Sequence, residues 1–115
     1  MFARKLTIAT VALQLAGCAS LTAGDPALYQ ELAESDVTLA SRLVQTTLEG
    51  SPDGTTRRWS NRETGNGGAV TPLRTYVSER GRFCREYREE LAVAGSTGRF
   101  YHTACREDGP RWAWL

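Results

Sequence analysis

The chain has 115 residues, which is enough for one domain and too few for two independent hydrophobic cores. Hydrophobic residues make up 41% and charged residues 23%, a mix typical of a globular protein rather than a disordered or fibrous one. The formal net charge of the chain is +1. Without Arg4 and Lys5, which lie in the leader described next, the remaining chain has twelve arginines and thirteen acidic residues. This chain has no excess of positive charge, so nucleic acid is not an expected partner.

Residues 1–17 are predicted to be an export signal. Two basic residues precede the apolar run 6–15, which ends in small residues. This order of a basic, an apolar and a small-residue part is the pattern of a secretory signal peptide. The apolar run is too short to cross a bilayer as a helix, which takes about 20 residues.

The four residues Leu15-Ala16-Gly17-Cys18 resemble the lipobox of bacterial lipoproteins. This resemblance implies cleavage before Cys18 and acylation of Cys18, so that residues 18–24 become a lipidated tether to a membrane. Two or three acyl chains on one residue give a lasting anchor. Cys18 is not followed by the Asp that commonly retains lipoproteins at the inner membrane, which favours the outer membrane, on its periplasmic or surface face. A plain secretory signal that ends in cysteine is the alternative.

Residues 25–115 are predicted to form a single domain, which begins with an amphipathic helix. Asp25-Pro26 is a good helix start, with a side-chain acceptor at the N-cap and proline at the first position. Ser35-Asp36 is a second candidate N-cap, where the helix would break or kink. The helix is expected to end near Glu49, because Gly50 can adopt the left-handed cap and Pro52 cannot continue a helix. One apolar stripe on this helix predicts core packing; it consists of Leu28, Leu32, Leu39, Leu43, Val44 and Leu48.

From Thr55 onward, glycines separate short runs rich in aromatic and β-branched residues, which predicts an antiparallel meander of four or five strands. Pro72 lacks a backbone donor and is therefore expected at a bulge or on the solvent side of an edge. A helix followed by a run of strands is typical of the α+β class. The strands are expected near residues 56–61, 69–77, 82–93, 98–106 and 111–114.

Cys84 and Cys105 remain after Cys18 is set aside, and an even pair in an exported chain predicts a disulfide. If the two residues lie opposite each other in a hairpin, the turn centres between Ala94 and Gly95. Residues 84 and 105 then form a non-hydrogen-bonded pair, in which the two chains approach closely enough for a disulfide. The single histidine and the absence of a CxxC pair argue against a zinc site, and no metal or cofactor is expected.

The same register predicts which side chains face the helix. Leu91, Val93 and Phe100 are expected on that face with Phe83, Tyr87 and Ala104. His102 falls on the same face, where a hydrogen-bonded core histidine is expected rather than a metal ligand. Glu86, Glu89 and Glu90 are interpreted as solvated strand residues, and Trp112 and Trp114 as core residues, with a sugar-stacking platform as the alternative.

Charge is uneven along the chain. Residues 25–49 hold five acidic residues and one arginine, whereas residues 56–88 hold eight arginines and three acidic residues. The arginines are candidates for an anion-binding patch, since guanidinium binds phosphate and carboxylate bidentately. Alternation along strands would instead scatter them over both faces and pair some with the acidic helix. The candidates are Arg57, Arg58, Arg62, Arg74 and Arg85, with Arg80 and Arg82 nearby, and lipopolysaccharide phosphates or peptidoglycan carboxylates are the anions within reach.

An ordered set of short motifs spans the region from about residue 36 to residue 115. The set is Leu48-Glu49, Trp59-Ser60-Asn61, Thr64-Gly65-Asn66-Gly67-Gly68-Ala69-Val70-Thr71-Pro72, Cys84-Arg85-Glu86-Tyr87, Thr103-Ala104-Cys105-Arg106, Asp108-Gly109 and Trp112. It resembles the carboxy-terminal domain of the bacterial 17-kDa surface antigen family. The resemblance implies an outer-membrane lipoprotein and transfers no catalytic residue. Many family members carry a glycine-zipper segment after the lipidated cysteine, and residues 19–35 have no such repeat.

We therefore expect a non-enzymatic envelope lipoprotein of surface-antigen type, with a structural or contact role. The alternatives are a binding inhibitor, for example of host lysozyme, or a binder of anionic envelope polymers through the arginines. The sequence does not identify a protein partner. It contains no catalytic motif of the G-x-S-x-G, Walker A or dinucleotide-binding type.

Overall fold

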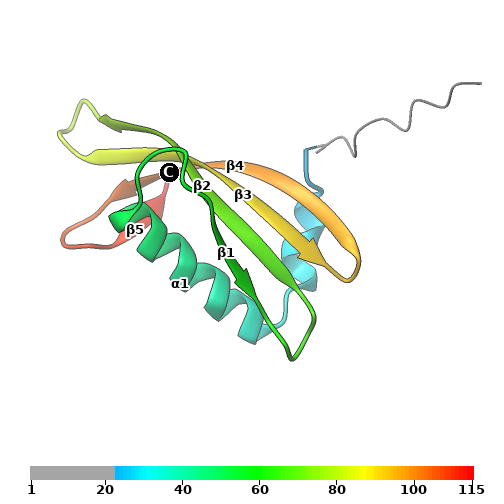
Figure 1. Cartoon of the computed structure of the whole chain (residues 1–115). Helices are drawn as coiled ribbons and strands as arrows, with labels where there is room; N and C mark the ends of the chain where they lie inside the picture. Colours follow the sequence, from blue (N-terminus) through cyan, green and yellow to red (C-terminus); the bar gives the residue numbers. More distant parts are fainter. Residues whose placement is uncertain (1–22) are drawn as a thin grey trace, which may run out of the picture.

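The structure is a computed structural model of the chain and describes residues 23–115. The described residues form one layer of helices on one antiparallel sheet, whose strands follow the chain order (Figure 1). This confirms the predicted α+β class. The predicted signal peptide and Cys18 lie outside the described residues. The elements are the 3-10 helix η1 (Pro26–Glu31), α1 (Glu34–Gly50), β1 (Arg57–Ser60), β2 (Gly67–Val77), β3 (Phe83–Val93), β4 (Ser96–Arg106) and β5 (Trp112–Trp114).

The predicted helical region is two helices, and the break lies earlier than expected. Asp25 caps η1, because its carboxylate accepts a hydrogen bond of 2.9 Å from the Ala27 N–H. The chain is extended at Leu32 and Ala33, and α1 begins at Glu34. Asp36 is not the N-cap of α1. It is the third helical residue, and its side chain reaches back to the Ala33 N–H at 2.9 Å, as in the carboxylate half of a capping box.

The end of α1 also differs from the prediction. Gly50 is the last helical residue, and it does not adopt the left-handed conformation expected of it. The extended Ser51 ends the helix instead, with its N–H bonded to the Thr47 carbonyl at 2.9 Å.

The β3–β4 hairpin has the predicted register, with Cys84 opposite Cys105 and Tyr87 opposite His102. A disulfide joins Cys84 and Cys105, whose Cα atoms are 4.0 Å apart. Ala94 and Gly95 both have positive φ, 51° and 80°, as a two-residue turn of type I′ requires. The prediction for Pro72 is confirmed as well, because the β2–β3 register shifts between Pro72 and Arg74.

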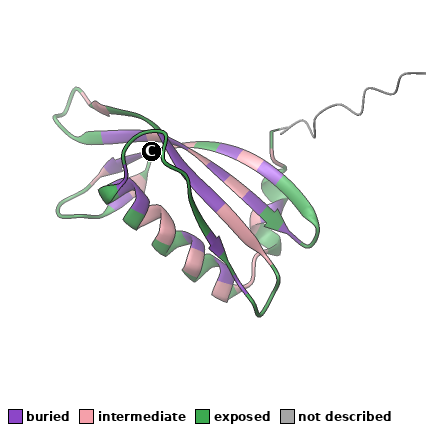
Figure 2. Ribbon diagram, in the orientation of Figure 1, coloured by how far each residue is buried: buried purple, intermediate pink, exposed green. Residues whose placement is uncertain are grey.

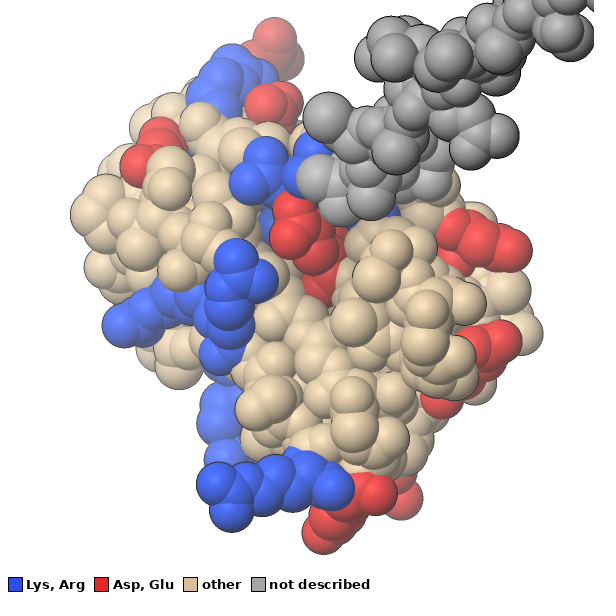
Figure 3. All heavy atoms as spheres, turned by 45° about the vertical axis from the view of Figure 1, so that its right-hand side comes forward, with Lys and Arg blue, Asp and Glu red and all other residues tan. Residues whose placement is uncertain are grey.

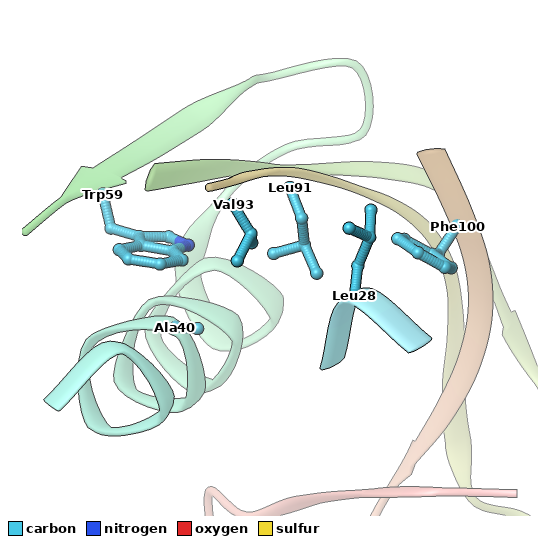
Figure 4. Packing of buried hydrophobic residues seen from close by; sticks show 6 residues of the cluster. All are labelled: Leu28, Ala40, Trp59, Leu91, Val93 and Phe100. Carbon is cyan, nitrogen blue, oxygen red and sulfur yellow. The ribbon is translucent and has the colours of Figure 1, made fainter. Parts of the chain in front are cut away.

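The core lies between the sheet and the two helices. Buried residues alternate along most of β3 and lie on the side of α1 that faces the sheet (Figure 2). Leu28 of η1 and Ala40 of α1 point toward the sheet, where Trp59, Leu91, Val93 and Phe100 meet them (Figure 4). A second cluster, nearer the end of α1, consists of Leu48, Val70, Tyr87, Ala104 and Trp112. Phe83 departs from the prediction, since it lies at the start of β3 and is 52% exposed.

Candidate functional site

The asparagines and threonine of the Trp59-x-Asn61 and Thr64-Gly65-Asn66 motifs hold one buried carboxylate. Asp36 of α1 is fully buried. It accepts hydrogen bonds from the Asn61 amide at 2.8 Å, the Thr64 hydroxyl at 2.7 Å and the Asn66 amide at 2.8 Å. With the Ala33 N–H, these donors attach the β1–β2 loop to the first turn of α1. The motif therefore has a structural role.

Burial alone would disfavour the charge on Asp36. The hydrogen bonds from Thr64, Asn66, the Ala33 N–H and Asn61 outweigh burial and lower the pKa of Asp36 to about 2. The carboxylate is therefore ionised throughout the neutral range, and it also lies in the first turn of α1, where the helix dipole favours negative charge.

Asn66 connects a third element to this network. Its side-chain oxygen accepts a hydrogen bond of 3.1 Å from the Ala94 N–H in the β3–β4 turn. The same side chain therefore binds the start of α1 and the tip of the hairpin. Gly68, two residues further on, lies against Trp59: a Cβ at this position would lie 2.5 Å from the indole nitrogen and 2.6 Å from the Glu90 carbonyl oxygen. Only glycine fits this close approach.

Arg85 of the Cys84-Arg85-Glu86-Tyr87 motif is buried beneath the end of α1. Its guanidinium donates a hydrogen bond of 2.7 Å to the Leu48 carbonyl and forms an ion pair of 2.7 Å with Asp53. The hydrogen bond from Arg85 is also the main reason why the pKa of Asp53 is lowered. A cation at a helix C-terminus satisfies free carbonyls and the helix dipole together. Arg85 therefore caps α1 and is not available to an external anion, contrary to the prediction.

Glu49 of the Leu48-Glu49 motif joins the end of α1 to the last two strands of the sheet. Its carboxylate accepts hydrogen bonds from the Trp112 indole at 2.9 Å and from Arg106 at 2.8 Å. Gln45, one turn earlier, exchanges two hydrogen bonds with the backbone of Trp112. The residues that carry the family resemblance thus hold the helix on the sheet at both of its ends.

The predicted arginine patch does not form as one surface. Arg57 and Arg58 are neighbours on β1 and point to opposite faces of the sheet, and Arg62 is exposed in the β1–β2 loop. Arg74 is engaged by Glu86 through two hydrogen bonds of 3.1 and 2.9 Å. On the side of the molecule that Figure 3 shows, basic side chains are spread out, and acidic side chains lie between some of them.

A cavity of about 320 Å³ opens between η1, α1 and the end of the sheet. Its lining is mostly apolar and aromatic, with a few polar groups. The side chains that line it include Tyr29, Leu32, Val37, Val44, Gln45, Tyr87, Glu89, Trp112 and Trp114. Such a combination is typical of small-molecule sites in general.

Glu89 and His102 lie beside this cavity and share a hydroxyl. The Tyr29 hydroxyl donates to the Glu89 carboxylate and lies 2.7 Å from His102 Nε2. A hydroxyl has one proton, so Nε2 must carry hydrogen and donate to Tyr29. Burial and Glu89 raise the pKa of Tyr29, so this tyrosine stays neutral. His102 is hydrogen-bonded, as predicted.

Two expectations for this region are wrong. Glu89 was expected in solvent, but it is only 4% exposed because it shares the helix-facing side of β3 with Tyr87 and Leu91. Trp114 was expected in the core and is 60% exposed. Its ring stacks on His102 at 4.5 Å between ring centroids, and its indole N–H donates to the Tyr87 hydroxyl.

The sheet face turned away from α1 and η1, which we call the outer face, carries charged residues, among them Arg58 and Arg74 of the predicted arginine patch. Glu90 binds Arg99 at 3.0 Å and Arg88 at 3.4 Å, so two arginines share one carboxylate. Alternation along the strands places their side chains on this face. Its charged residues are Arg58, Arg74, Arg88, Arg99, Glu86 and Glu90.

Among residues 23–115, no three His, Cys, Asp or Glu side chains gather where they could bind a metal ion. No helix in this part of the chain combines the length and the apolar character needed to cross a membrane.

Comparison with known proteins gives one family. Residues 46–113 match the family described as 17 kDa outer membrane surface antigen. Over 79 residues the chain is 39% identical to the 17 kDa surface antigens of Rickettsia bellii and Rickettsia felis and 37% identical to that of Rickettsia prowazekii. The aligned part is 69% of this chain, and the chain spans about half the length of these curated relatives. No solved structure gives a significant match.

Proposed function

The chain belongs to the family of 17 kDa outer membrane surface antigens, and from this we propose that it is a lipid-anchored, non-enzymatic protein of the outer membrane. The mature protein begins at Cys18, which carries the lipid. The folded domain that follows has a structural or contact role in the cell envelope.

The Leu15-Ala16-Gly17-Cys18 lipobox carries the proposal of an anchor. The first described residues support it, because they join the domain directly to the tether. The Gly24 N–H donates a hydrogen bond of 2.8 Å to the Arg99 carbonyl, and Ala23 forms a parallel bridge with Arg99. Five residue steps separate Cys18 from Ala23, which span at most about 18 Å. The lipid therefore holds the domain close to the membrane surface.

The contact role is supported by the motif residues, whose contacts are internal to the domain. Asp36, Glu49 and Arg85 each bond to backbone or side-chain partners that join α1 to the sheet or its loops. Their polar groups are committed to holding the domain together. Surfaces of the sheet and helix are then the parts of the molecule that meet other envelope components.

Substitution of Cys18 tests the anchor. We expect Cys18→Ala to lose the acyl groups seen by mass spectrometry and to disappear from the outer-membrane fraction of a density gradient. An uncleaved signal peptide would hold this variant at the inner membrane, which the gradient separates. Ser20→Ala is the matched control and should fractionate like the unchanged protein. An unmodified amino terminus in the unchanged protein, or Cys18→Ala in the outer membrane, would refute the anchor.

A further inference from the structure

The outer face of the sheet and the surface of the two helices carry opposite charge. The outer face of the sheet holds four arginines and two glutamates. The surface of η1 and α1 has the reverse balance, because the exposed charged residues of 25–49 are four acidic residues and one arginine, Arg42. An anionic surface therefore attracts the outer face and repels the helices.

The tether restricts how far the domain can move from a membrane. It starts at the β4 edge, where Ala23 pairs with Arg99. Arg58, Glu90 and Arg99 lie in one line across β1 to β4, and three strand spacings of about 4.8 Å separate Arg58 from Arg99. The distance from Arg99 to Arg58 is thus shorter than the extended tether. A lipid at Cys18 brings this row of residues within reach of the head groups.

The shape and composition of the outer face suit a lipid head group. A hollow of about 620 Å³ has Arg58 on one side and Glu90 on the other. The bottom of this hollow is formed by small residues, which include Gly67, Ala69 and Ala92. Tyr101 lies opposite Arg88 and is 63% exposed. Arginines with an exposed tyrosine are typical of surfaces at the membrane–water interface.

We infer that the outer face of the sheet docks on anionic phospholipid head groups of the membrane that holds the anchor. The group of Arg88, Arg99 and Glu90 keeps a net charge of +1 and, together with Arg58, attracts the head-group phosphates; Tyr101 lies at the interface. The helices and the cavity beside them then face away from the membrane. This inference rests on the proposed lipid anchor at Cys18.

Two exposed aromatic residues report on the orientation. Tyr101 lies on the outer face and is 63% exposed, whereas Trp114 lies on the helix side and is 60% exposed. The lipidated mature protein is reconstituted in vesicles of phosphatidylglycerol and phosphatidylethanolamine, or of phosphatidylcholine alone. Hydroxyl-radical oxidation of each side chain is then measured by mass spectrometry. We expect anionic vesicles to slow the oxidation of Tyr101 severalfold and to leave Trp114 unchanged.

Charge variants test whether the arginines cause the protection. Each arginine near an anionic surface contributes about a fivefold change in binding, so Arg88→Gln/Arg99→Gln should reduce the equilibrium constant for docking about 25-fold and restore the oxidation of Tyr101. Arg42→Gln removes one exposed arginine from the helix side and should leave Tyr101 protected. Equal oxidation of Tyr101 in both vesicles, or protection of Trp114 instead, would overturn the inference.

A separate measurement distinguishes failure of the proposed lipid anchor from failure of the docking inference. A mass spectrum without lipid on Cys18 refutes the proposed function alone. In that case the inference still requires the full chain to float with phosphatidylglycerol vesicles and Arg88→Gln/Arg99→Gln to float less. Flotation that is equal in both proteins, or absent in both, rejects the inference.

Discussion

The amide nitrogen of Asn66 donates a hydrogen bond of 2.8 Å to the Asp36 carboxylate across 30 residues of sequence. Through this contact the β1–β2 loop holds the first turn of α1, and the oxygen of the same amide holds the β3–β4 turn at Ala94. The charge on one buried carboxylate is therefore linked to the packing of the helix on the sheet.

Acid is expected to weaken the fold through Asp36. The folded pKa of about 2 lies below the usual value of 3.8, so the ionised carboxylate stabilises the fold above about pH 4. This contribution is lost as pH falls toward 2 and amounts to about 1–2 kcal/mol. Urea unfolding between pH 4 and pH 2 measures it. Asp36→Asn should be less stable at neutral pH and should lack this part of the pH dependence; an unchanged dependence would show that other groups cause it.

Arg85 is expected to matter more for stability than any arginine on the surface. Arg85→Met leaves the buried Leu48 carbonyl without its donor and removes one of the two side-chain hydrogen bonds to Asp53, and a buried acceptor without a partner costs about 1–3 kcal/mol. Arg80→Met, in the exposed β2–β3 turn, is the matched control and should change the unfolding free energy by less than about 0.5 kcal/mol. Urea unfolding compares them. Equal, small effects would mean that Arg85 does not cap α1 in solution.

The shared hydroxyl of Tyr29 is expected to stabilise the cavity wall. Tyr29→Phe removes the group between Glu89 and His102 and leaves a carboxylate that is only 4% exposed with one fewer donor. The expected loss in unfolding free energy is about 1–3 kcal/mol. Tyr101→Phe, whose ring is 63% exposed, should be neutral within about 0.5 kcal/mol. If the two variants unfold alike, the contacts of the Tyr29 hydroxyl contribute nothing to stability.

The sequence predicted the hairpin well because two constraints agreed there. A pairing of Cys84 with Cys105 and a turn at Ala94-Gly95 define the same register, and each residue of β3 then has one partner. Helix ends were harder to predict. Asp36 has the composition of an N-cap, yet it acts from the third helical position, because Asn61, Thr64 and Asn66 surround it there. These contacts are far apart in the sequence.

The candidate site was predicted less well, because charge was taken as a sign of exposure. Arg85 and Glu89 share the helix-facing side of β3 with Tyr87, and the predicted alternation already placed them there. Their burial needs partners that only the fold supplies: the end of α1 for Arg85, and Tyr29 and His102 for Glu89. The signal that was missed is strand parity, which outweighs side-chain charge when a partner lies opposite.

Two glycine-to-alanine substitutions should have opposite effects, and one of them tests how the tether is joined to the domain. At Gly98, a Cβ would lie 2.8 Å from the Leu28 side chain and 2.9 Å from the Gly24 Cα atom, so Gly98→Ala should push the chain at Gly24 off β4. The expected cost is about 1–3 kcal/mol. At Gly50, the last residue of α1, no atom lies within 4 Å of the added Cβ, so Gly50→Ala should stabilise the protein by up to about 1 kcal/mol.

Hydrogen exchange at Gly24 distinguishes displacement of this segment from a general loss of stability. The Gly24 N–H is protected only while it bonds to the Arg99 carbonyl. In Gly98→Ala it should exchange faster by a larger factor than the amides of β3 do, whereas Gly50→Ala should leave it as slow as before. Uniform acceleration throughout the sheet would mean that the first described residues do not pack independently on β4.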